Sequence, residues 1–204
     1  DYVFNMGALQ QDYVNANMLK GGLAYADRIT TVSGTYAWEI QTAEYGERLE
    51  NHLRYHSGKL RGIVNGIDTE TYDPSNDRNL DAPYSSEDPS GKAADKRALQ
   101  QQMGLSCDPA VPLIGMVTRL VEHKGIDLVK YAFGRLMRQE VQLAILGTGD
   151  WVYESFFDEM AQRYPGKFAF YKGFVSSLAH KIYAGADLFL MPSLSEPCGL
   201  AQMI

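Results

Sequence analysis

Residues 113–150 read LIGMVTRLVEHKGIDLVKYAFGRLMRQEVQLAILGTGD, and this stretch carries the clearest fold signal of the chain. Two short apolar runs within it, at residues 113–117 and 142–146, have the length of buried β-strands. Between them, residues 125–138 carry apolar side chains every three or four positions, which predicts an amphipathic helix. A strand, a helix and a second strand in this order are typical of a β-α-β unit with parallel strands.

The same alternation continues on both sides of this stretch. The sequence predicts further strands at residues 62–64, 168–171 and 188–191, and further helices at residues 92–103, 151–163 and 177–184. Uninterrupted apolar strands suit a parallel sheet that is covered by helices on both faces. We therefore predict an α/β fold with a Rossmann-like parallel sheet. Residues 73–91, rich in Pro, Asp, Asn and Ser, are predicted to be an exposed excursion.

The N-terminal part has a different pattern. It predicts a helix from residue 17, a short strand at residues 28–32 and a second helix that Ser33 would cap. Polar residues and two glycines at residues 44–59 favour a connector. We accordingly predict that residues 1–58 end a second α/β domain and that residues 59–204 begin the Rossmann-like domain.

Composition excludes several classes of function. The 204 residues carry 19 basic and 25 acidic side chains, a net charge of −6, which gives no electrostatic footprint for nucleic acid or an anionic membrane. No apolar stretch approaches the roughly 20 residues that span a bilayer. Cys107 and Cys198 are far apart, so we expect neither a disulfide framework nor a zinc site, and a cytoplasmic location fits. The chain also begins without Met, which led us to expect an internal fragment.

Four loops at the predicted carboxyl edge of the sheet could bind a ligand. In the first, Arg119 and Lys124 precede a helix and could hold a diphosphate, because fixed positive charge stabilises a leaving group that departs as an anion. The alternative is that both are solvated surface cations. In the second, Gly147 and Gly149 would let a ligand approach the backbone, or simply make a tight turn. The third glycine of a dinucleotide-binding fingerprint is absent, which disfavours a dehydrogenase.

The other two loops add an aromatic residue and a carboxylate. Phe174 could stack on a nucleobase or pack against its own loop. Glu196, followed by Pro197 and a Gly that would open a helix, could bind sugar hydroxyls while backbone amides face a phosphate. Glu196 could equally be one of many exposed loop acids, and Cys198 a small buried thiol.

Taken together, these segments resemble the bacterial glycogen synthases and plant starch synthases, a family of retaining glycosyltransferases with the two-domain GT-B fold. The resemblance covers nearly the whole chain, and its specificity lies in the order and spacing of several motifs. The motifs are Lys20-Gly21-Gly22-Leu23, Thr30-Thr31-Val32-Ser33, Tyr36-Ala37-Trp38-Glu39-Ile40, Gly62-Ile63-Val64-Asn65-Gly66, Arg119 with Lys124-Gly125, Ala184-Gly185-Ala186-Asp187 and Glu196-Pro197-Cys198-Gly199-Leu200.

The resemblance implies transfer of glucose from ADP-glucose, or UDP-glucose in some relatives, to an α-1,4-glucan acceptor. It implies no metal and no cofactor, because the nucleotide sugar is a substrate, and a plastid location if the source is a plant or alga. Arg119 and Lys124 would bind the diphosphate and Glu196 the donor glucose, so these three are the predicted catalytic residues. The predicted substrate-binding residues are Gly147, Gly149, Phe174, Cys198, Gly199 and Leu200.

Three positions depart from the family pattern. Phe174 stands where a Tyr is common, Ala201 where a Thr is usual and Gly34 where a Pro is usual. The resemblance also implies that a glycine-rich donor loop and an acceptor-domain His belong to a region before Asp1. Because the active site of this fold lies between two domains, we expect negligible transferase activity from this chain alone.

Two alternatives remain open at this stage. One is another GT-B glycosyltransferase with a different nucleotide sugar, such as a relative of sucrose synthase. The other is a nucleotide-binding module that keeps the Rossmann-like fold without chemistry. The sequence does not predict an oligomeric state.

Overall fold

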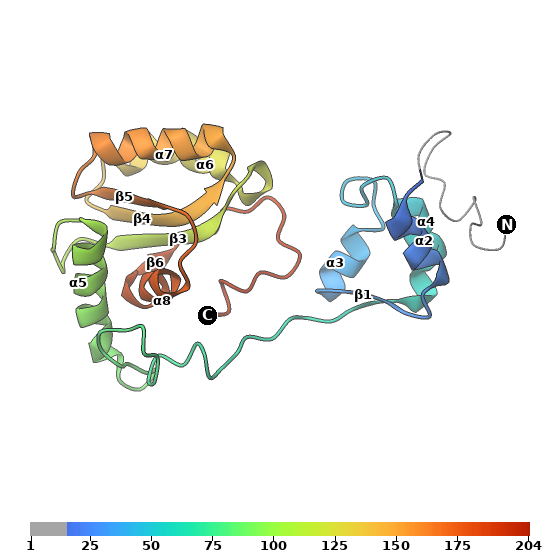
Figure 1. The fold of residues 1–204 in the computed structure, drawn as a ribbon, viewed down its shortest axis with the longest axis horizontal. Coiled ribbons are helices and arrows are strands. Elements are labelled where there is room, and N and C mark those ends of the chain that lie inside the picture. The colour runs from blue at the N-terminus through green and yellow to red at the C-terminus, as the bar shows by residue number, and fades with distance from the viewer. Residues whose placement is uncertain (1–15) are drawn as a thin grey trace. The chain divides into compact units, whose positions relative to one another are not determined.

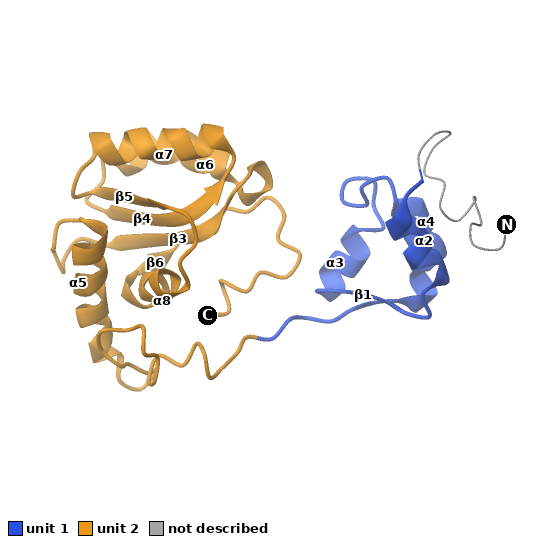
Figure 2. Ribbon diagram, viewed as in Figure 1, with its two compact units in different colours: residues 1–66 blue, residues 67–204 orange. Residues whose placement is uncertain are grey.

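A computed structural model describes residues 16–204 and divides the chain into two compact units. One unit extends to Gly66 and the other comprises residues 67–204 (Figure 2). The sequence predicted a boundary after residue 58. The units divide later because strand β2 (Leu60–Gly62) pairs in parallel with β1 (Ile29–Thr31) and so belongs to the first unit. The strand predicted at residues 62–64 therefore lies two residues earlier, and it belongs to the first unit, not to the Rossmann-like sheet.

The first unit has short helices around the β1–β2 pair. They are α2 (Met18–Tyr25), α3 (Gly34–Glu39), α4 (Glu50–Tyr55) and the 3-10 turn η1 (Ser57–Lys59). The predicted cap of α3 is confirmed, because the Ser33 hydroxyl oxygen accepts a hydrogen bond of 2.9 Å from the Tyr36 amide. The connector predicted at residues 44–59 is wrong, since it contains α4. Leu53 is buried on that helix, and its tertiary packing outweighs the polar composition around it.

The second unit has a four-stranded sheet in the order β5-β4-β3-β6, and its parallel strands confirm the predicted Rossmann-like sheet (Figure 1). The strands are β3 (Leu113–Leu120), β4 (Gln142–Gly149), β5 (Phe168–Lys172) and β6 (Leu188–Phe189). Helices cover both faces: α5 (Lys92–Met103), α6 (Ile126–Leu136), α7 (Trp151–Arg163) and α8 (Ser176–Gly185). Figure 1 shows α6 and α7 on one face and α5 and α8 on the other.

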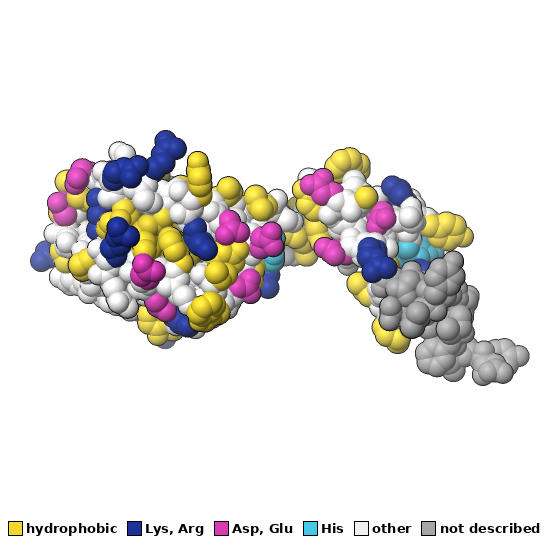
Figure 3. Space-filling view, turned by 90° about the horizontal axis from the view of Figure 1, so that it is seen from above, with side chains coloured by type: hydrophobic (Ala, Val, Ile, Leu, Met, Phe, Trp, Pro, Cys, Tyr) yellow, Lys and Arg dark blue, Asp and Glu magenta, His cyan; other side chains and the backbone are white. Residues whose placement is uncertain are grey.

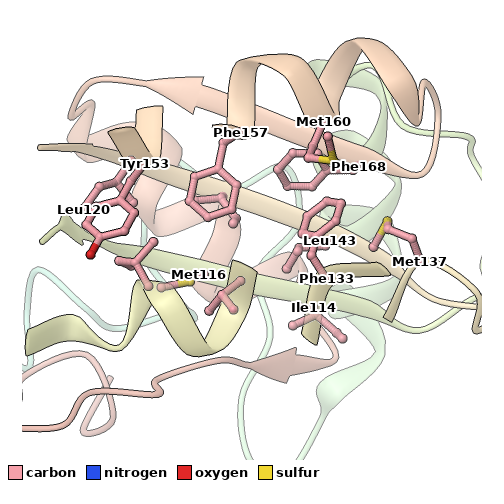
Figure 4. Packing of buried hydrophobic residues seen from close by; sticks show 13 residues of the cluster. Ile114, Met116, Leu120, Phe133, Met137, Leu143, Tyr153, Phe157, Met160 and Phe168 are labelled. Atoms are coloured by element: carbon pink, nitrogen blue, oxygen red, sulfur yellow. The ribbon is translucent and has the colours of Figure 1, made fainter. Parts of the chain in front are cut away.

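Each face has its own hydrophobic layer. The layer under α6 and α7 contains the buried aromatic side chains of this unit together with aliphatic ones, and the rings of Phe133 and Phe168 lie 4.9 Å apart, edge to face (Figure 4). Smaller aliphatic residues fill the layer under α5 and α8, including Leu99, Leu178 and Ile182. These layers account for the continuous apolar runs in the sequence, because the central strands β3 and β4 contribute buried residues to both of them.

Three strands end later than predicted, β5 by a single residue, and β6 ends earlier. β3 continues to Leu120 and β4 to Gly149, because their pairing persists through Arg119 opposite Thr148. As a result, Arg119, Gly147 and Gly149 lie in strand ends and not in loops. β6 pairs with β3 over Leu188–Phe189 only.

Residues 73–91 contain the short 3-10 turn η2 (Pro89–Gly91) and otherwise no regular structure, as predicted. Buried polar contacts nevertheless anchor this excursion to the second unit. The Asp77 carboxylate lies within hydrogen-bonding distance of His180 Nδ1 on α8, and the Asp95 carboxylate of α5 accepts hydrogen bonds from the Asp81 and Ala82 amides.

No helix in residues 16–204 is long and apolar enough to cross a bilayer. On the face seen in Figure 3, Lys and Arg side chains are interspersed with Asp and Glu, so this face has no extended field of one sign.

Candidate functional site

The order of the strands locates the first candidate site. From β3 the chain proceeds through β4 to β5 on one side, and then returns to place β6 on the other side of β3. In open α/β sheets, ligands bind outside the carboxyl ends of the strands at such a reversal. The segments that follow β3 and β6 meet at this point.

Main-chain contacts join these two segments. The carbonyl oxygen of His123, in the turn after β3, accepts hydrogen bonds from the amides of Leu194 (2.9 Å) and Ser195 (3.3 Å). Gly125 ends the same turn with a φ of 72°, and a Cβ there would lie 2.0 Å from the Pro192 carbonyl oxygen. The backbone thus explains why a glycine follows Lys124, since only glycine allows both the left-handed conformation and the close approach to Pro192.

Two of the predicted site residues, Lys124 and Glu196, meet at this junction. The Lys124 ammonium donates to Glu196 Oε2 over 2.6 Å, and the Ser193 hydroxyl donates to the same oxygen over 3.0 Å. The side chains of Lys124 and Glu196 are 14% and 26% exposed. Partial burial weakens solvent screening, so the pair is held more firmly than an ion pair in open solvent.

A cavity of about 120 Å³ contains this pair, and we call it the donor cavity. Its lining residues come from β3 and from the segments that follow β3 and β6. They are Met116, Val117, Thr118, Lys124, Leu190, Met191, Pro192, Ser193, Glu196, Leu200 and Ala201. Its volume is below the roughly 300–1,000 Å³ of complete small-molecule sites, so it can hold only part of a larger ligand.

Arg119 lies next to this cavity in sequence but does not line it. It is exposed on β3, and side chains alternate between the two faces of a strand, which separates it from Thr118. Within residues 16–204, its guanidinium has no ion-pair partner.

The glycines of β4 are explained by packing against β3. A Cβ at Gly147 would lie 2.3 Å from the Thr118 carbonyl oxygen, and one at Gly149 would lie 2.2 Å from that of Leu120. The close approach of the two strands thus requires both glycines, whether or not a ligand binds there.

A buried carboxylate, Glu154, organises this end of β4, and the sequence interpretation missed it. Its Oε1 accepts from the Thr148 hydroxyl (2.6 Å) and the Gly149 amide (2.9 Å), and its Oε2 pairs with Lys172 of β5 (2.8 Å). The hydrogen bond from Lys172, followed by that from Thr148, lowers the pKa of Glu154 to about 2. An acid in the first turn of a helix after a glycine-rich turn is the signal that could have identified it.

Phe174 follows the end of β5 and has a freely accessible ring, with 71% of its surface exposed. The residue before it, Gly173, has a φ of 138°, and its amide donates to the Gly147 carbonyl oxygen over 3.0 Å. This bond ties the Phe174 turn to β4. The side chain is thus available for stacking and does not pack into its own loop.

The last predicted segment, Cys198 to Leu200, leads into a turn. Gly199 has a φ of 74°, and the Met203 amide donates to the Leu200 carbonyl oxygen, which makes a turn. Residues 201–203 form a turn, and the helix that Gly199 would open stays a prediction. Leu200 lines the donor cavity, whereas Cys198 and Gly199 lie beside its lining residues in sequence.

Among residues 16–204, no group of three or more His, Cys, Asp or Glu side chains has the geometry to hold a metal ion. The side chains that could bind a ligand at the donor cavity are therefore an ammonium, a carboxylate and hydroxyls. Such a set suits an anionic group next to a polyhydroxylated one.

Comparison with known proteins gives consistent matches in both units. The family described as "Starch synthase catalytic domain" matches residues 2–55, and "Glycosyl transferases group 1" matches residues 105–203. The glycogen synthase of Geobacillus thermodenitrificans is 56% identical over 192 residues, which are 94% of this chain and 40% of that protein. The chain thus spans about two fifths of the length of the curated relatives that it matches.

Comparison with solved structures also gives a match to a starch synthase. The catalytic domain of starch synthase IV from Arabidopsis thaliana, bound to ADP and acarbose, matches with a TM-score of 0.87 and 39% identity. The match covers 92% of this chain and 39% of that one. HepE from Anabaena, in complex with UDP and glucose, matches with a TM-score of 0.55 at 16% identity, over 86% of this chain and 40% of that one. This second likeness concerns the fold alone.

Proposed function

The chain belongs to the glycogen and starch synthase family of glycosyltransferases, with the GT-B fold, and from this membership we propose that it provides the donor side of a glucan-elongating site. In this proposal residues 67–204 bind the nucleotide sugar, and the unit that ends at Gly66 belongs to the acceptor domain. Glucose passes from ADP-glucose to an α-1,4-glucan with retention of configuration.

The observation that carries this proposal is the Lys124–Glu196 pair at the reversal of strand order. When the bond between glucose and the diphosphate breaks, the diphosphate oxygen keeps the electron pair and gains negative charge. The Lys124 ammonium stabilises that charge, and the Glu196 carboxylate accepts hydrogen bonds from glucose hydroxyls. Their mutual contact fixes both groups before the donor binds, which reduces the reorganisation required during the reaction.

The remaining predicted residues have supporting roles. Arg119 supplies a second cation for the diphosphate from the rim, and Phe174 stacks on the base. Backbone amides at Cys198, Gly199 and Leu200 face the sugar and phosphate. Gly147 and Gly149 keep the adjacent strand end close to β3.

The choice of ADP-glucose is supported by the Arabidopsis starch synthase, which was solved with ADP. The nucleotide sugar is a substrate here, and the proposed reaction requires no cofactor. We propose a cytoplasmic location, or a plastid one if the source is a plant or alga. The chain alone is expected to turn over negligibly, because the donor cavity holds only part of the substrates.

The test measures glucan elongation from radiolabelled ADP-glucose by the complete polypeptide that the gene encodes. Glu196→Gln and Lys124→Ala are each expected to lower kcat by about 10²- to 10³-fold, the usual effect of removing one group that stabilises a transition state. Lys181→Ala is the matched control, because Lys181 also pairs with a carboxylate, that of Asp81 at 2.9 Å, but neither residue lines the donor cavity. Turnover by E196Q and K124A equal to that of K181A would contradict the proposal and favour a binding module without chemistry.

A separate measurement addresses the choice of donor. Isothermal titration of the complete polypeptide with ADP-glucose and UDP-glucose is expected to give the lower Kd for ADP-glucose. Tighter binding of UDP-glucose would assign the chain to another sugar-nucleotide specificity.

A further inference from the structure

A second cavity, of about 570 Å³, lies in the unit formed by residues 67–204, at the edge of the sheet opposite the donor cavity. Pro109 lies in the segment that leads into β3 and Asp187 lies directly before β6, so this is the amino-terminal edge of the strands. The lining residues are Lys92, Ala93, Lys96, Arg97, Gln100, Cys107, Pro109, Gly185 and Asp187. We call it the basic cavity. Its volume lies within the range of small-molecule sites.

The charges that line the basic cavity are unbalanced. Three cations, Lys92, Lys96 and Arg97, come from α5, and one carboxylate, Asp187, faces them. That carboxylate is already shared, because its Oδ2 pairs with Lys96 over 2.7 Å and accepts from the Leu113 amide, also over 2.7 Å. The cavity is thus positive, although the whole chain carries a net charge of −6.

Lys96 is buried and Lys92 is half-buried, yet both ammonium groups have unused hydrogen-bond donors. The Lys96 ammonium, 9% exposed, donates to the Pro109 carbonyl oxygen and to Asp187. The Lys92 ammonium donates to the Ala184 carbonyl oxygen and lies 4.8 Å from the centre of the Tyr84 ring. An ammonium has three donors, so these contacts within the described residues leave at least one on each.

Burial lowers the pKa of Lys92 even though Asp187 and Asp95 act in the opposite direction. The carboxylates nearby therefore do not fully compensate the cost of removing this charge from water. A ligand anion would supply the missing compensation.

From this cavity and its charges we infer that the basic cavity is a binding site for a small organic phosphate, separate from the donor site. The phosphate group contacts the spare donors of Lys92 and Lys96 and is closed in by Arg97, which is exposed on α5. The remaining volume takes the organic portion of the ligand, against Ala93, Gly185 and Pro109. This inference does not depend on the proposed transferase function.

The two cysteines of the chain provide a direct test. Cys107 is an exposed thiol that lines the basic cavity, and Cys198 lies near the donor cavity, so each reports on a different site. The 204-residue chain is alkylated with iodoacetamide in the presence of ribose 5-phosphate, inorganic phosphate or ribose. The rate at each cysteine is followed by mass spectrometry of the peptides.

Ribose 5-phosphate at about ten times its Kd is expected to slow alkylation of Cys107 about tenfold, with Cys198 unchanged and ribose without effect. Arg97→Gln is expected to weaken the Kd for ribose 5-phosphate about tenfold, through loss of a charge-assisted contact. Arg97 is exposed, so this change does not disturb the core. Arg135→Gln, which removes the same charge from an exposed site on α6, is expected to bind as the unchanged chain does.

Calorimetric titration with ribose 5-phosphate gives an independent Kd for each variant. Equal protection of Cys107 by ribose would overturn the inference, as would equal affinities of R97Q and R135Q. Protection by inorganic phosphate as strong as that by ribose 5-phosphate would overturn the assignment of an organic ligand. Loss of activity in K124A, described above, has no bearing on these results, so the two proposals fail separately.

Discussion

Glu154 is the side chain that connects the ends of β4 and β5, and its ionisation has a measurable consequence. Its pKa in the folded chain is about 2, against 4.5 as the ordinary value, with the hydrogen bond from Lys172 as the largest cause. Because the folded pKa is the lower one, the carboxylate stabilises the fold fully above about pH 4.5. That contribution disappears as the pH falls toward 2.

We therefore expect Glu154→Gln to reduce the free energy of unfolding at pH 7 and to approach the unchanged chain near pH 2. Urea denaturation at several pH values measures this difference. Glu159→Gln, on the exposed side of the same helix, is the control and is expected to show no such dependence. A constant deficit of E154Q from pH 7 to pH 2 would show that the charge is not the source of stability.

The sequence assigned Lys124 and Glu196 to one binding site only through the resemblance to the glycogen and starch synthases. Their residue types suit the chemistry, but 72 positions separate them, and the reversal of strand order that joins them is a tertiary feature. Glu154 escaped notice because an acid near the start of a helix is common. Its importance depends on Lys172, which arrives from another strand.

The junction between η3 (Glu122–Lys124) and α6 depends on a glycine, which gives a prediction for the turn as a unit. Gly125→Ala is expected to destabilise the chain by about 1–2 kcal/mol from the left-handed backbone alone. The clash with the Pro192 carbonyl oxygen adds to this cost, and it also displaces Lys124 from Glu196. Thermal unfolding measures the loss of stability, and the Kd for ADP measures the effect of displacing Lys124.

Gly134→Ala is the matched control for that change. Gly134 lies inside α6, and a Cβ there would meet nothing within 4 Å. Alanine at this position is expected to stabilise the chain by about 0.5–1 kcal/mol, because glycine is a poor helix former. Equal effects of G125A and G134A would refute the role assigned to the turn.

The helices and strands differ in how well the sequence predicts them. Two helices, Lys92–Met103 and Trp151–Arg163, have the predicted ends, because their apolar spacing is regular and glycine or proline lies nearby. The ends of β3 and β4 were misjudged because glycines and polar residues normally indicate loops. Here Gly147 and Gly149 continue a strand whose neighbour leaves no room for a side chain. Such crowding is invisible until the two strands are paired.

For the molecule as a whole, we expect residues 67–204 to fold as a separate polypeptide. Among the described residues, both hydrophobic layers of this unit come from its own strands and helices. Trp151 is its single tryptophan and serves as a fluorescent reporter. A single cooperative urea transition of this polypeptide supports the expectation, and a broad transition without a baseline contradicts it.

The aromatic layer then predicts the size of one core defect. Phe133 is 2% exposed and contacts several rings, so Phe133→Ala is expected to lose about 3–5 kcal/mol. Tyr131→Ala, on the same helix at a residue that is 83% exposed, is expected to change stability by less than about 0.5 kcal/mol. Urea denaturation of the two variants in the same polypeptide provides the comparison.

The overall architecture followed from the sequence more fully than the division between units did. Alternating apolar runs and amphipathic stretches specify a parallel α/β sheet, because both signals are local. The division after Gly66 depends on the pairing of Leu60–Gly62 with Ile29–Thr31, across about 30 residues of sequence. No local pattern encodes that partner.

The contact between Lys124 and Glu196 has a consequence for which molecules the donor cavity accepts. In the proposed site, a neutral sugar can hydrogen-bond to Glu196 but gives the other donors of the Lys124 ammonium no anion to bind. A phosphate next to the sugar accepts from those donors while the remaining lone pairs of Glu196 accept from the hydroxyls, so the contact between Lys124 and Glu196 stays intact. We therefore expect the donor cavity to bind sugars that are joined to a phosphate more tightly than free sugars.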